Sequence, residues 1–312
     1  MNTAHLLAVF DASSVNLSIL VGQAIRLGVL ISFVALGEMV SQRAGVLNIG
    51  VEGVFLATAC AAAAASFLGW GVWTGFLIAP LVGMATMSLI SFLVLVLRAD
   101  QIVTGFGINL ASIGFTTVIV KSKPDLNFVD SLKKVKPFGD SGVLADMFNH
   151  KPSVYLVIPA MVISWFVLMR TSWGLRVKAV GETPAAADAA GLVVNRIRWQ
   201  AMLMCGVLVG LGGASLALGQ GSGFTENMVA GRGFIALVAV IFGRWRPGLV
   251  VAGCLFFGLF EAVTLQAPAW GLNIQSQLLN MVPYLSCLLA LALFRKGTTP
   301  PSAITRPFER KR

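Results

Sequence analysis

The sequence predicts an all-α membrane protein, a polytopic bundle of transmembrane helices, from its composition and the pattern of its apolar residues. Of its 312 residues, 57% are hydrophobic and 12% are charged. Soluble domains are about 45–50% apolar and about 25% charged, so the composition excludes a water-soluble domain. It also excludes disorder, because disordered chains combine low hydrophobicity with high charge. The apolar residues form long runs without the alternation of β-barrel strands, so the spans are expected to be helical.

The apolar runs predict about nine spans, within a range of eight to ten. The runs are 15–36, 46–68, 76–97, 102–120, 153–169, 200–219, 234–243, 249–265 and 278–294. Most are near the length that a helix needs to cross hydrocarbon at about 1.5 Å per residue. The run 234–243 is about half that length, so its span must begin near Phe224 and include Arg232. We expect one broken helix there, whose polar backbone lines a cavity rather than lipid.

Lysine and arginine set the expected orientation. They are concentrated in the loop 170–199, in the tail 295–312 and in the turn around Arg244 and Arg246. The positive-inside rule places these three regions in the cytoplasm. Counting back through the spans puts the N-terminal tail 1–14 outside, together with the lysine-containing loop 121–151. The net charge of +10 is therefore explained by basic cytoplasmic regions rather than by nucleic-acid binding. Residues 1–312 are interpreted as one domain, and no signal peptide is expected.

Motifs for catalysis or cofactor binding are missing from the sequence. It contains two histidines, no GxSxG or HExxH motif and no phosphate-binding GxxxxGK[ST] loop. The four cysteines lie in apolar runs and form no CxxC pair, so no metal site is expected. The chain is therefore expected to be non-catalytic and to hold no cofactor of its own.

The segment 181–191 predicts a short cytoplasmic helix. Thr183 is suited to the N-cap, Pro184 to the first helical position and Gly191 to the C-terminal stop. An isolated helix of this length is marginal in water, so it is expected to dock, either in a groove of a partner or against its own membrane helices. The residues assigned to this candidate coupling helix are Gly181, Glu182, Thr183, Pro184, Ala187, Asp188 and Gly191.

Polar residues in or near the spans mark a candidate pathway. Glu38 and Arg43 are expected to form a structural charge pair near the cytoplasmic surface. Intramembrane polar residues either serve function or form interhelical hydrogen bonds, and the sequence leaves this open for Glu52, Asn109 and Glu261. The role of Arg26 is open too, because it has no partner nearby in the sequence. The candidate pathway residues are Asn48, Glu52, Asn109, Glu226 and Asn227.

Three stretches together resemble a known family. They are GEMVSQRAGVLNIGVEG at 37–53, LRVKAVGETPAAADAAGLVVNRIR at 175–198 and GRGFIALVAVIFGRWRP at 231–247. The sequence resembles the permease subunits of bacterial ABC importers of the branched-chain amino acid and ribose type, and most of all the nucleoside/simple-sugar subgroup. Thr183 stands where that family commonly has asparagine, and the family often has ten helices with an inner N-terminus.

The resemblance implies a function and a set of partners. It implies a multi-pass permease of the bacterial inner membrane, embedded in the lipid bilayer with its C-terminus in the cytoplasm. Such a subunit imports nucleosides or related small polar solutes. It pairs with a second homologous permease, an extracytoplasmic binding protein, and two ATPase subunits that hold ATP and Mg and dock on the 181–191 segment. The alternatives are a simple-sugar permease, a stand-alone secondary transporter or channel, for which inverted repeats would be the sign, and a purely structural membrane subunit. No clear repeat is visible in the sequence.

Overall fold

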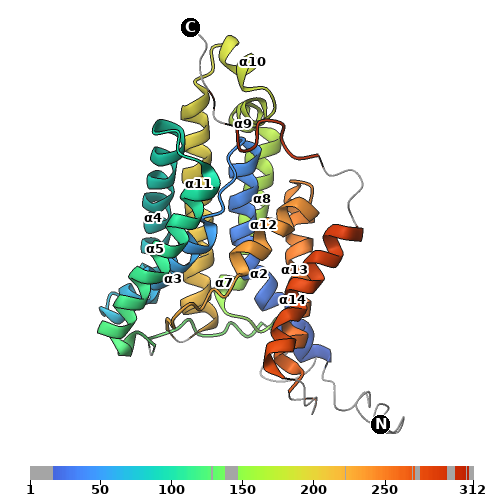
Figure 1. The fold of residues 1–312 in the computed structure, drawn as a ribbon. Helices are drawn as coiled ribbons and strands as arrows, with labels where there is room; N and C mark the ends of the chain where they lie inside the picture. The colour runs from blue at the N-terminus through green and yellow to red at the C-terminus, as the bar shows by residue number, and fades with distance from the viewer. Residues whose placement is uncertain are drawn as a thin grey trace.

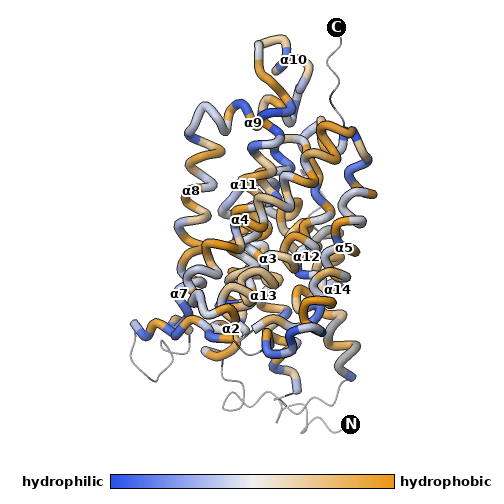
Figure 2. Tube along the Cα trace, turned by 90° about the vertical axis from the view of Figure 1, so that its left-hand side faces the viewer, coloured by the Kyte–Doolittle hydropathy of each residue, from blue (hydrophilic) through white to orange (hydrophobic). Residues whose placement is uncertain are grey.

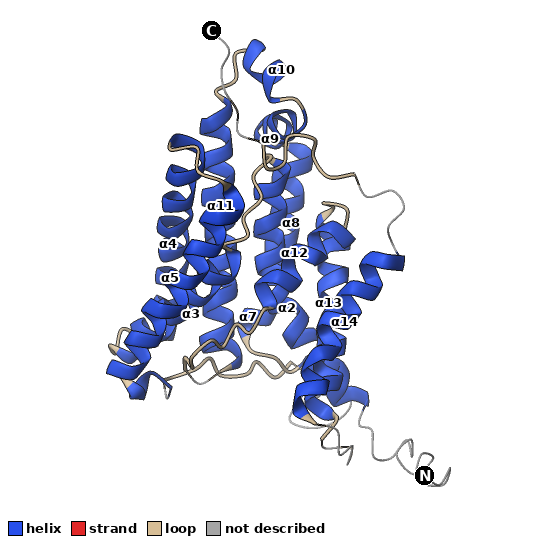
Figure 3. Ribbon diagram, viewed as in Figure 1, coloured by secondary structure: helices blue, strands red, loops and turns tan. Residues whose placement is uncertain are grey.

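The computed structural model describes residues 17–127, 129–137, 147–221, 223–268, 270, 275–293, 299–306 and 308. Every regular element in these residues is a helix (Figures 1 and 3). In chain order they are α2 (Leu17–Arg43), α3 (Val51–Phe67), α4 (Val72–Ser91), η1 (Phe92–Val96), α5 (Gln101–Ser122), η2 (Pro124–Asn127), α7 (Pro152–Tyr155), α8 (Val157–Arg170), α9 (Ser172–Glu182), α10 (Pro184–Ala189), α11 (Val194–Ala214), η3 (Ser215–Gln220), α12 (Arg232–Phe242), α13 (Pro247–Gln266) and α14 (Ser276–Leu293). The all-helical prediction is confirmed for this part of the chain.

Six helical stretches are long and apolar enough to cross a membrane. They are Leu17–Arg43, Val72–Val96, Gln101–Ser122, Pro152–Arg170, Val194–Gln220 and Pro247–Gln266. The predicted count of about nine spans is not confirmed, because two further apolar helices of the described chain, Val51–Phe67 and Arg232–Phe242, are shorter. Figure 2 shows polar residues gathered at the two ends of the bundle, with apolar residues along the helices between them.

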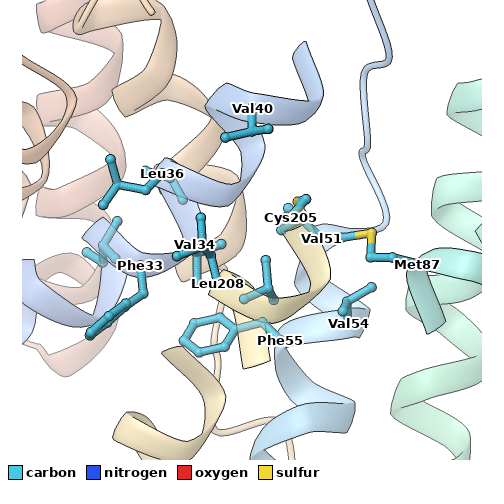
Figure 4. Packing of buried hydrophobic residues seen from close by; sticks show 14 of the residues in the cluster. Phe33, Val34, Leu36, Val40, Val51, Val54, Phe55, Met87, Cys205 and Leu208 are labelled. Atoms are coloured by element: carbon cyan, nitrogen blue, oxygen red, sulfur yellow. The ribbon is translucent and has the colours of Figure 1, made fainter. Parts of the chain in front are cut away.

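Helices α2 and α11 lie antiparallel at the centre of the bundle. Near the end of α2, the Arg198 side chain of α11 donates from Nε to the Ala44 carbonyl (3.1 Å). At the other end of the pair, Gln220 donates from Nε2 to the Arg26 carbonyl (2.6 Å). The surrounding core comes from several helices: Figure 4 shows Phe33 and Leu36 of α2 packed with Phe55 of α3. The interior of the described chain is thus mostly apolar, in keeping with the low charge of the sequence.

Small residues let helix backbones approach closely in this bundle. A Cβ atom on Gly206 would lie 2.5 Å from the Gly83 carbonyl oxygen of α4, and one on Gly210 would lie 2.6 Å from the Ala79 oxygen. Helices α4 and α11 therefore touch backbone to backbone. Any larger side chain at these two positions would force the helices apart.

Two helices begin in the middle of the bundle and run in opposite directions. After α2 ends, residues 44–50 continue without helix, and α3 starts only at Val51. Residues 223–231 likewise form no helix before α12 starts at Arg232. The sequence predicted one broken span, but the structure contains two half-helices, because the segment around Gly45 and Gly50 is also non-helical.

The half-helices belong to a repeated arrangement. A long helix, a half-helix and two further helices follow one another in α2–α5, and the same order returns in α11–α14. The repeat is inverted because α2 and α11 are antiparallel, and each half-helix packs against the long helix of the other set (Figure 1). The structure thus contains a repeat that is not visible in the residue pattern.

One end of the bundle carries α9, α10 and residues 299–306, and we call it the α10 end (Figure 1). The opposite end carries the start of α2 and the segment that follows α5. The predicted N-terminal tail 1–14 lies outside the described residues, as do 295–298, 307 and 309–312 of the predicted C-terminal tail.

Candidate functional site

The two half-helices meet at Glu52, the second residue of α3. One carboxylate oxygen of Glu52 accepts a hydrogen bond from the Gly231 backbone N–H (2.6 Å), and the other accepts from the Gly233 N–H (2.7 Å). These donors belong to the first turn of α12, where backbone N–H groups have no partner within the helix and the helix dipole is positive. Glu52 is 7% exposed. Its negative charge therefore caps α12 and fixes the two half-helices together.

The junction requires glycine at position 233, because the backbone of α12 lies very close to Glu52 there. A Cβ atom on Gly233 would lie 2.5 Å from a Glu52 carboxylate oxygen and 2.9 Å from the Glu52 Cα atom. The start of α12 therefore rests directly on the start of α3, and the sequence GRG at 231–233 leaves room for this contact.

The first turn of α12 also carries the positive side of the site. The guanidinium group of Arg232 donates to one oxygen of Glu261 on α13 (2.7 Å from Nε and 2.5 Å from Nη2) and to the Met228 carbonyl (2.8 Å). Both side chains of the ion pair are mostly buried, at 20% and 12% exposed. The guanidinium of Arg232 is thus held by a backbone carbonyl on one side and by Glu261 on the other.

Polar side chains from α5 and α14 hold the non-helical segments that precede the half-helices. Asn109 accepts from the Gly53 N–H (2.7 Å) and donates to the Ile49 carbonyl (3.0 Å). Tyr284 donates its hydroxyl hydrogen to the Ala230 carbonyl (2.6 Å). Asn109 and Tyr284 thus make equivalent contacts in the two halves of the repeat.

These residues surround a cavity of about 660 Å³ between the two half-helices and α5, α13 and α14. Its lining includes the polar residues Glu52, Asn109, Asn227, Arg232 and Glu261 and the aromatic residues Phe106, Phe234 and Tyr284. The volume is within the range of about 300–1,000 Å³ for small-molecule sites. Polar and ionised groups inside a membrane-spanning bundle are costly unless they are paired or line a hydrated space. The cavity is therefore the best candidate for a solute pathway.

Three of the five predicted pathway residues line this cavity, namely Glu52, Asn109 and Asn227. Glu226 is exposed beside the cavity and is not among its lining residues. Asn48 is buried away from the cavity and donates from Nδ2 to a Glu38 oxygen (2.9 Å). Asn48 precedes the first residue of α3, so it does not share a regular helical face with Glu52.

The predicted charge pair between Glu38 and Arg43 is corrected by the structure. Glu38 is fully buried and accepts from Asn48 and from the Cys205 thiol (3.5 Å). Arg43 instead donates from Nη2 to the Trp245 carbonyl (3.1 Å). The pairing fails because α2 continues as a regular helix to Arg43, and residues five apart on a helix point in different directions.

The sequence did not predict the ion pair between Arg232 and Glu261 or the hydrogen bond from Tyr284 to the Ala230 carbonyl. Glu261 lies 29 residues from Arg232 and on another helix, so no local spacing could pair them. The one available signal was that an isolated carboxylate in a span needs a partner, and Arg232 was the unassigned cation in the same half of the chain.

A double-mutant cycle measures the Arg232–Glu261 pair. We expect Arg232→Gln or Glu261→Gln alone to lower the free energy of unfolding by about 3 kcal/mol, because each leaves a mostly buried charge without its partner. The double variant is expected to lose less than the sum of the two, because it leaves no unpaired charge. Thermal unfolding of the three variants in detergent micelles checks this, and strictly additive losses would contradict it.

The candidate coupling helix forms as α10. Pro184 occupies its first position, and Gly191 follows its end with φ +84°. The Leu192 N–H donates to the Ala187 carbonyl (3.0 Å) and the Gly191 N–H to the Asp188 carbonyl (2.9 Å), which is the Schellman ending. The predicted cap by the Thr183 side chain is not formed. Ala185, Ala186 and Ala189 of α10 are exposed and give the helix a smooth outer face.

The base of α10 is attached to the end of α2. A Cβ atom on Gly181 would lie 2.0 Å from the Arg43 carbonyl oxygen, so the last turn of α9 packs against the α2 backbone. The Gly181 carbonyl accepts from the Ala303 N–H (3.0 Å). Trp245, between α12 and α13, donates from its indole to Gln42 of α2 (2.8 Å). The segment that carries α10 is therefore in contact with the end of α2, and the end of α2 is in contact with the turn after α12.

An antiparallel bundle of membrane-length helices with a polar cavity between two half-helices defines a membrane transport protein. Residues 20–294 match the family described as "Branched-chain amino acid transport system / permease component", and the chain belongs to this family. Inverted repeats also occur in stand-alone secondary transporters, so the repeat by itself does not separate the two classes, whereas the family match does.

Three relatives cover nearly the whole chain. The "Nucleoside ABC transporter permease protein NupC" of Lactococcus lactis is 32% identical, over 92% of this chain and 96% of its own length. The "Guanosine ABC transporter permease protein NupQ" of Bacillus subtilis is 34% identical, over 94% of this chain and 97% of its own length. The "Putative glucose ABC transporter permease protein TsgC13" of Haloferax volcanii is 28% identical, over 94% of this chain and 98% of its own length.

Proposed function

We propose that this chain is the membrane-spanning subunit of an ATP-driven importer for nucleosides, and that the solute passes through the cavity between α3 and α12. The observation that carries the proposal is the composition of this cavity, in which hydrogen-bonding and aromatic side chains share one space. The names of two relatives, which mention a nucleoside and guanosine, support the choice of solute.

The chemistry of a nucleoside suits the lining. A nucleobase is a planar ring with donors and acceptors on its edge, and a ribose carries several hydroxyl groups. Phe106 and Phe234 offer ring surfaces for stacking, and base–aromatic stacking is worth about 1–3 kcal/mol. Asn227 offers a donor and an acceptor in the same cavity. A neutral solute also leaves the Arg232–Glu261 pair intact.

A second permease is proposed to close the cavity on the side of α5 and α14. Phe106 and Leu110 of α5 and Tyr284 of α14 line the cavity and are still 52%, 71% and 44% exposed. A cavity that contains ionised Arg232 and Glu261 would be costly if it opened sideways to lipid. A homologous subunit that packs against these helices would separate the pathway from the bilayer, and the pair is proposed to be a heterodimer.

Energy is proposed to enter through α10. In this proposal two ATPase subunits, which hold ATP and Mg, seat α10 in a groove on the cytoplasmic side of the bacterial inner membrane. The chain itself is non-catalytic in this proposal, and its C-terminus lies in the cytoplasm with α10. An extracytoplasmic binding protein delivers solute at the opposite end. The contact of Gly181 with Arg43 gives α10 a mechanical route to the helices around the cavity.

A simple sugar is the second candidate solute, and the name of the Haloferax relative favours it. The two solutes make different demands on the cavity. A nucleobase needs a flat apolar surface, whereas a sugar depends mainly on hydroxyl partners. The response to the loss of an aromatic ring therefore separates the two candidates.

A matched pair of variants on α5 tests the solute. We expect Phe106→Ala to lower ATP-dependent uptake of radiolabelled guanosine about tenfold, because a stacking surface is lost. Phe115→Ala is the control, because Phe115 is exposed on the same helix and does not line the cavity. Uptake is measured in proteoliposomes with the complete complex, with unlabelled nucleosides and glucose as competitors. ATP-dependent uptake of radiolabelled glucose without uptake of guanosine would exclude the nucleoside proposal in favour of the sugar.

A further inference from the structure

A second cavity lies at the end of the bundle opposite α10, and its lining is strongly positive. It measures about 280 Å³ and lies between the start of α2, the segment after α5 and the residues that precede α7. Its charged and titratable lining residues are Arg26, Lys134, Lys136, Lys151 and His150. Among the lining residues that the structure describes, none is Asp or Glu.

The backbone holds these cations together. The Val135 N–H donates to the His150 carbonyl (2.9 Å), so the lysines on either side of Val135 lie next to His150. The Leu132 N–H donates to the Leu218 carbonyl near the end of α11 (3.1 Å). Lys151 donates from Nζ to the Ser131 hydroxyl (3.2 Å). The positive groups are thus fixed by the fold and are not brought together by flexible surface side chains alone.

Several polar atoms of the cavity have no partner. His150 is 7% exposed, and its Nε2 atom is buried without a hydrogen bond. The ring instead bonds through its other side to the Met147 backbone. The Nε atom of Arg26 is buried and unbonded as well, and the structure shows no carboxylate within ion-pair distance of its guanidinium among the residues described. Buried polar groups normally have partners, so these atoms point to a missing ligand.

Electrostatics indicate the sign of that ligand. Burial lowers the pKa of the His150 ring below its usual range, and the positive charges of Arg26 and Lys134 lower it further. The pKa of the Lys151 ammonium is lowered by burial and by the same two cations. An anion in the cavity would relieve this repulsion and give Nε2 of a protonated His150 an acceptor.

We propose that this cavity binds a phosphate group. Arginine and lysine together suit the several oxygens of a phosphate, since guanidinium can bind two of them and each ammonium contributes a point charge. Arg26 lies in the N-terminal half of α2, which begins at Leu17 and is long enough to span a membrane. Exposed apolar Ile19 lines the same cavity, a combination that matches the phosphate and acyl chain of an anionic lipid. A free phosphate would use the same cations.

Histidine titration tests the proposal directly, because the sequence contains only His5 and His150. The full chain with His5→Asn, labelled at histidine, has one reporter ring for NMR. We compare nanodiscs of phosphatidylcholine, the same discs with inorganic phosphate, and discs that contain phosphatidylglycerol. The charged groups that face the ring are Arg26 from α2, Lys134 and Lys136 from the segment after α5, and Lys151 beside it.

Occupancy by phosphate is expected to move the midpoint of the His150 titration upward by about one pH unit, because a nearby negative charge favours the protonated ring. A shift with phosphatidylglycerol and not with inorganic phosphate assigns the site to lipid, and the reverse result assigns it to free phosphate. A shift with both supports the site with either source. No shift with either probe would overturn the proposal.

Matched double variants distinguish phosphate binding in the cavity from a general effect of positive charge at this end of the bundle. Arg26→Gln with Lys134→Gln is expected to weaken binding of the effective probe at least about tenfold, because two charged contacts are lost. Lys121→Gln with Lys123→Gln removes the same charge at the same end from exposed residues outside the cavity, and it is expected to have no effect. Lys134→Gln alone, at an exposed loop residue, serves if the double variant fails to fold. Equal effects of the cavity variants and their control would overturn the proposal.

Discussion

Replacing Glu52 with Gln is expected to abolish most transport and to destabilise the junction of the half-helices. The carboxylate accepts from two N–H groups of the first turn of α12, while an amide offers one acceptor and turns its NH₂ group toward the other N–H. The variant loses one charge-assisted hydrogen bond and leaves a backbone N–H without an acceptor. Together these changes are expected to destabilise the junction by about 2–4 kcal/mol. A cost of this size corresponds to about 30-fold or more in any equilibrium that needs the assembled junction.

Uptake in proteoliposomes and thermal unfolding of the same Glu52→Gln preparation measure the two effects. Glu226→Gln is the matched control, because Glu226 is exposed nearby and does not line the cavity. We expect the control to retain both uptake and stability. Glu52→Asp is expected to fail as well, since the shorter side chain cannot reach both donors. Normal uptake by Glu52→Gln would show that the junction does not need the carboxylate.

A bulky residue on the outer face of α10 is expected to uncouple ATP hydrolysis from uptake. Ala186 is exposed, so Ala186→Trp leaves the interior of the bundle unchanged. If α10 docks in a partner groove, the indole overfills that groove at a cost of about 1–3 kcal/mol, which reduces uptake about 5- to 150-fold. ATP-driven uptake and the ATPase rate of the complete complex are the measurements.

Ala186→Ser is the size-matched control and is expected to transport normally. A substitution at Gly181 would not serve, because its Cβ would lie 2.0 Å from the Arg43 carbonyl oxygen and would disturb the bundle itself. Membrane abundance and unfolding temperature should be the same for both Ala186 variants. Normal uptake by Ala186→Trp would exclude docking through this face of α10.

Local patterns predicted the elements whose causes are local. Pro184 and Gly191 bound α10 as expected, because the first position of a helix and its left-handed ending each depend on one residue type. Gly206 and Gly210 are four apart and therefore lie on one face of α11, where both touch the α4 backbone. The 224–243 region predicted a broken span, because its polar residues cannot cross lipid as a regular helix.

Contacts between distant parts of the chain were not predictable in this way. Proximity in the sequence predicted a pair between Glu38 and Arg43. In the structure Glu38 accepts from Asn48, and Arg43 donates to the Trp245 carbonyl. Asn48 was assigned to the pathway but is buried against Glu38. Arg26 had no visible role until the fold brought lysines and His150 from 134–151 beside it.

The sequence by itself determined that this is a helical membrane protein, where its charge lies and which family it resembles, because composition, run length and motif identity are properties of contiguous residues. Only the tertiary structure decided that α3 is a second half-helix, that Glu52 caps α12 across 179 residues, and that the two halves form an inverted repeat. The physical reason is that a buried charge is stabilised by whatever donor the fold places beside it. That donor is selected by helix packing, which the spacing of residues along one helix does not encode.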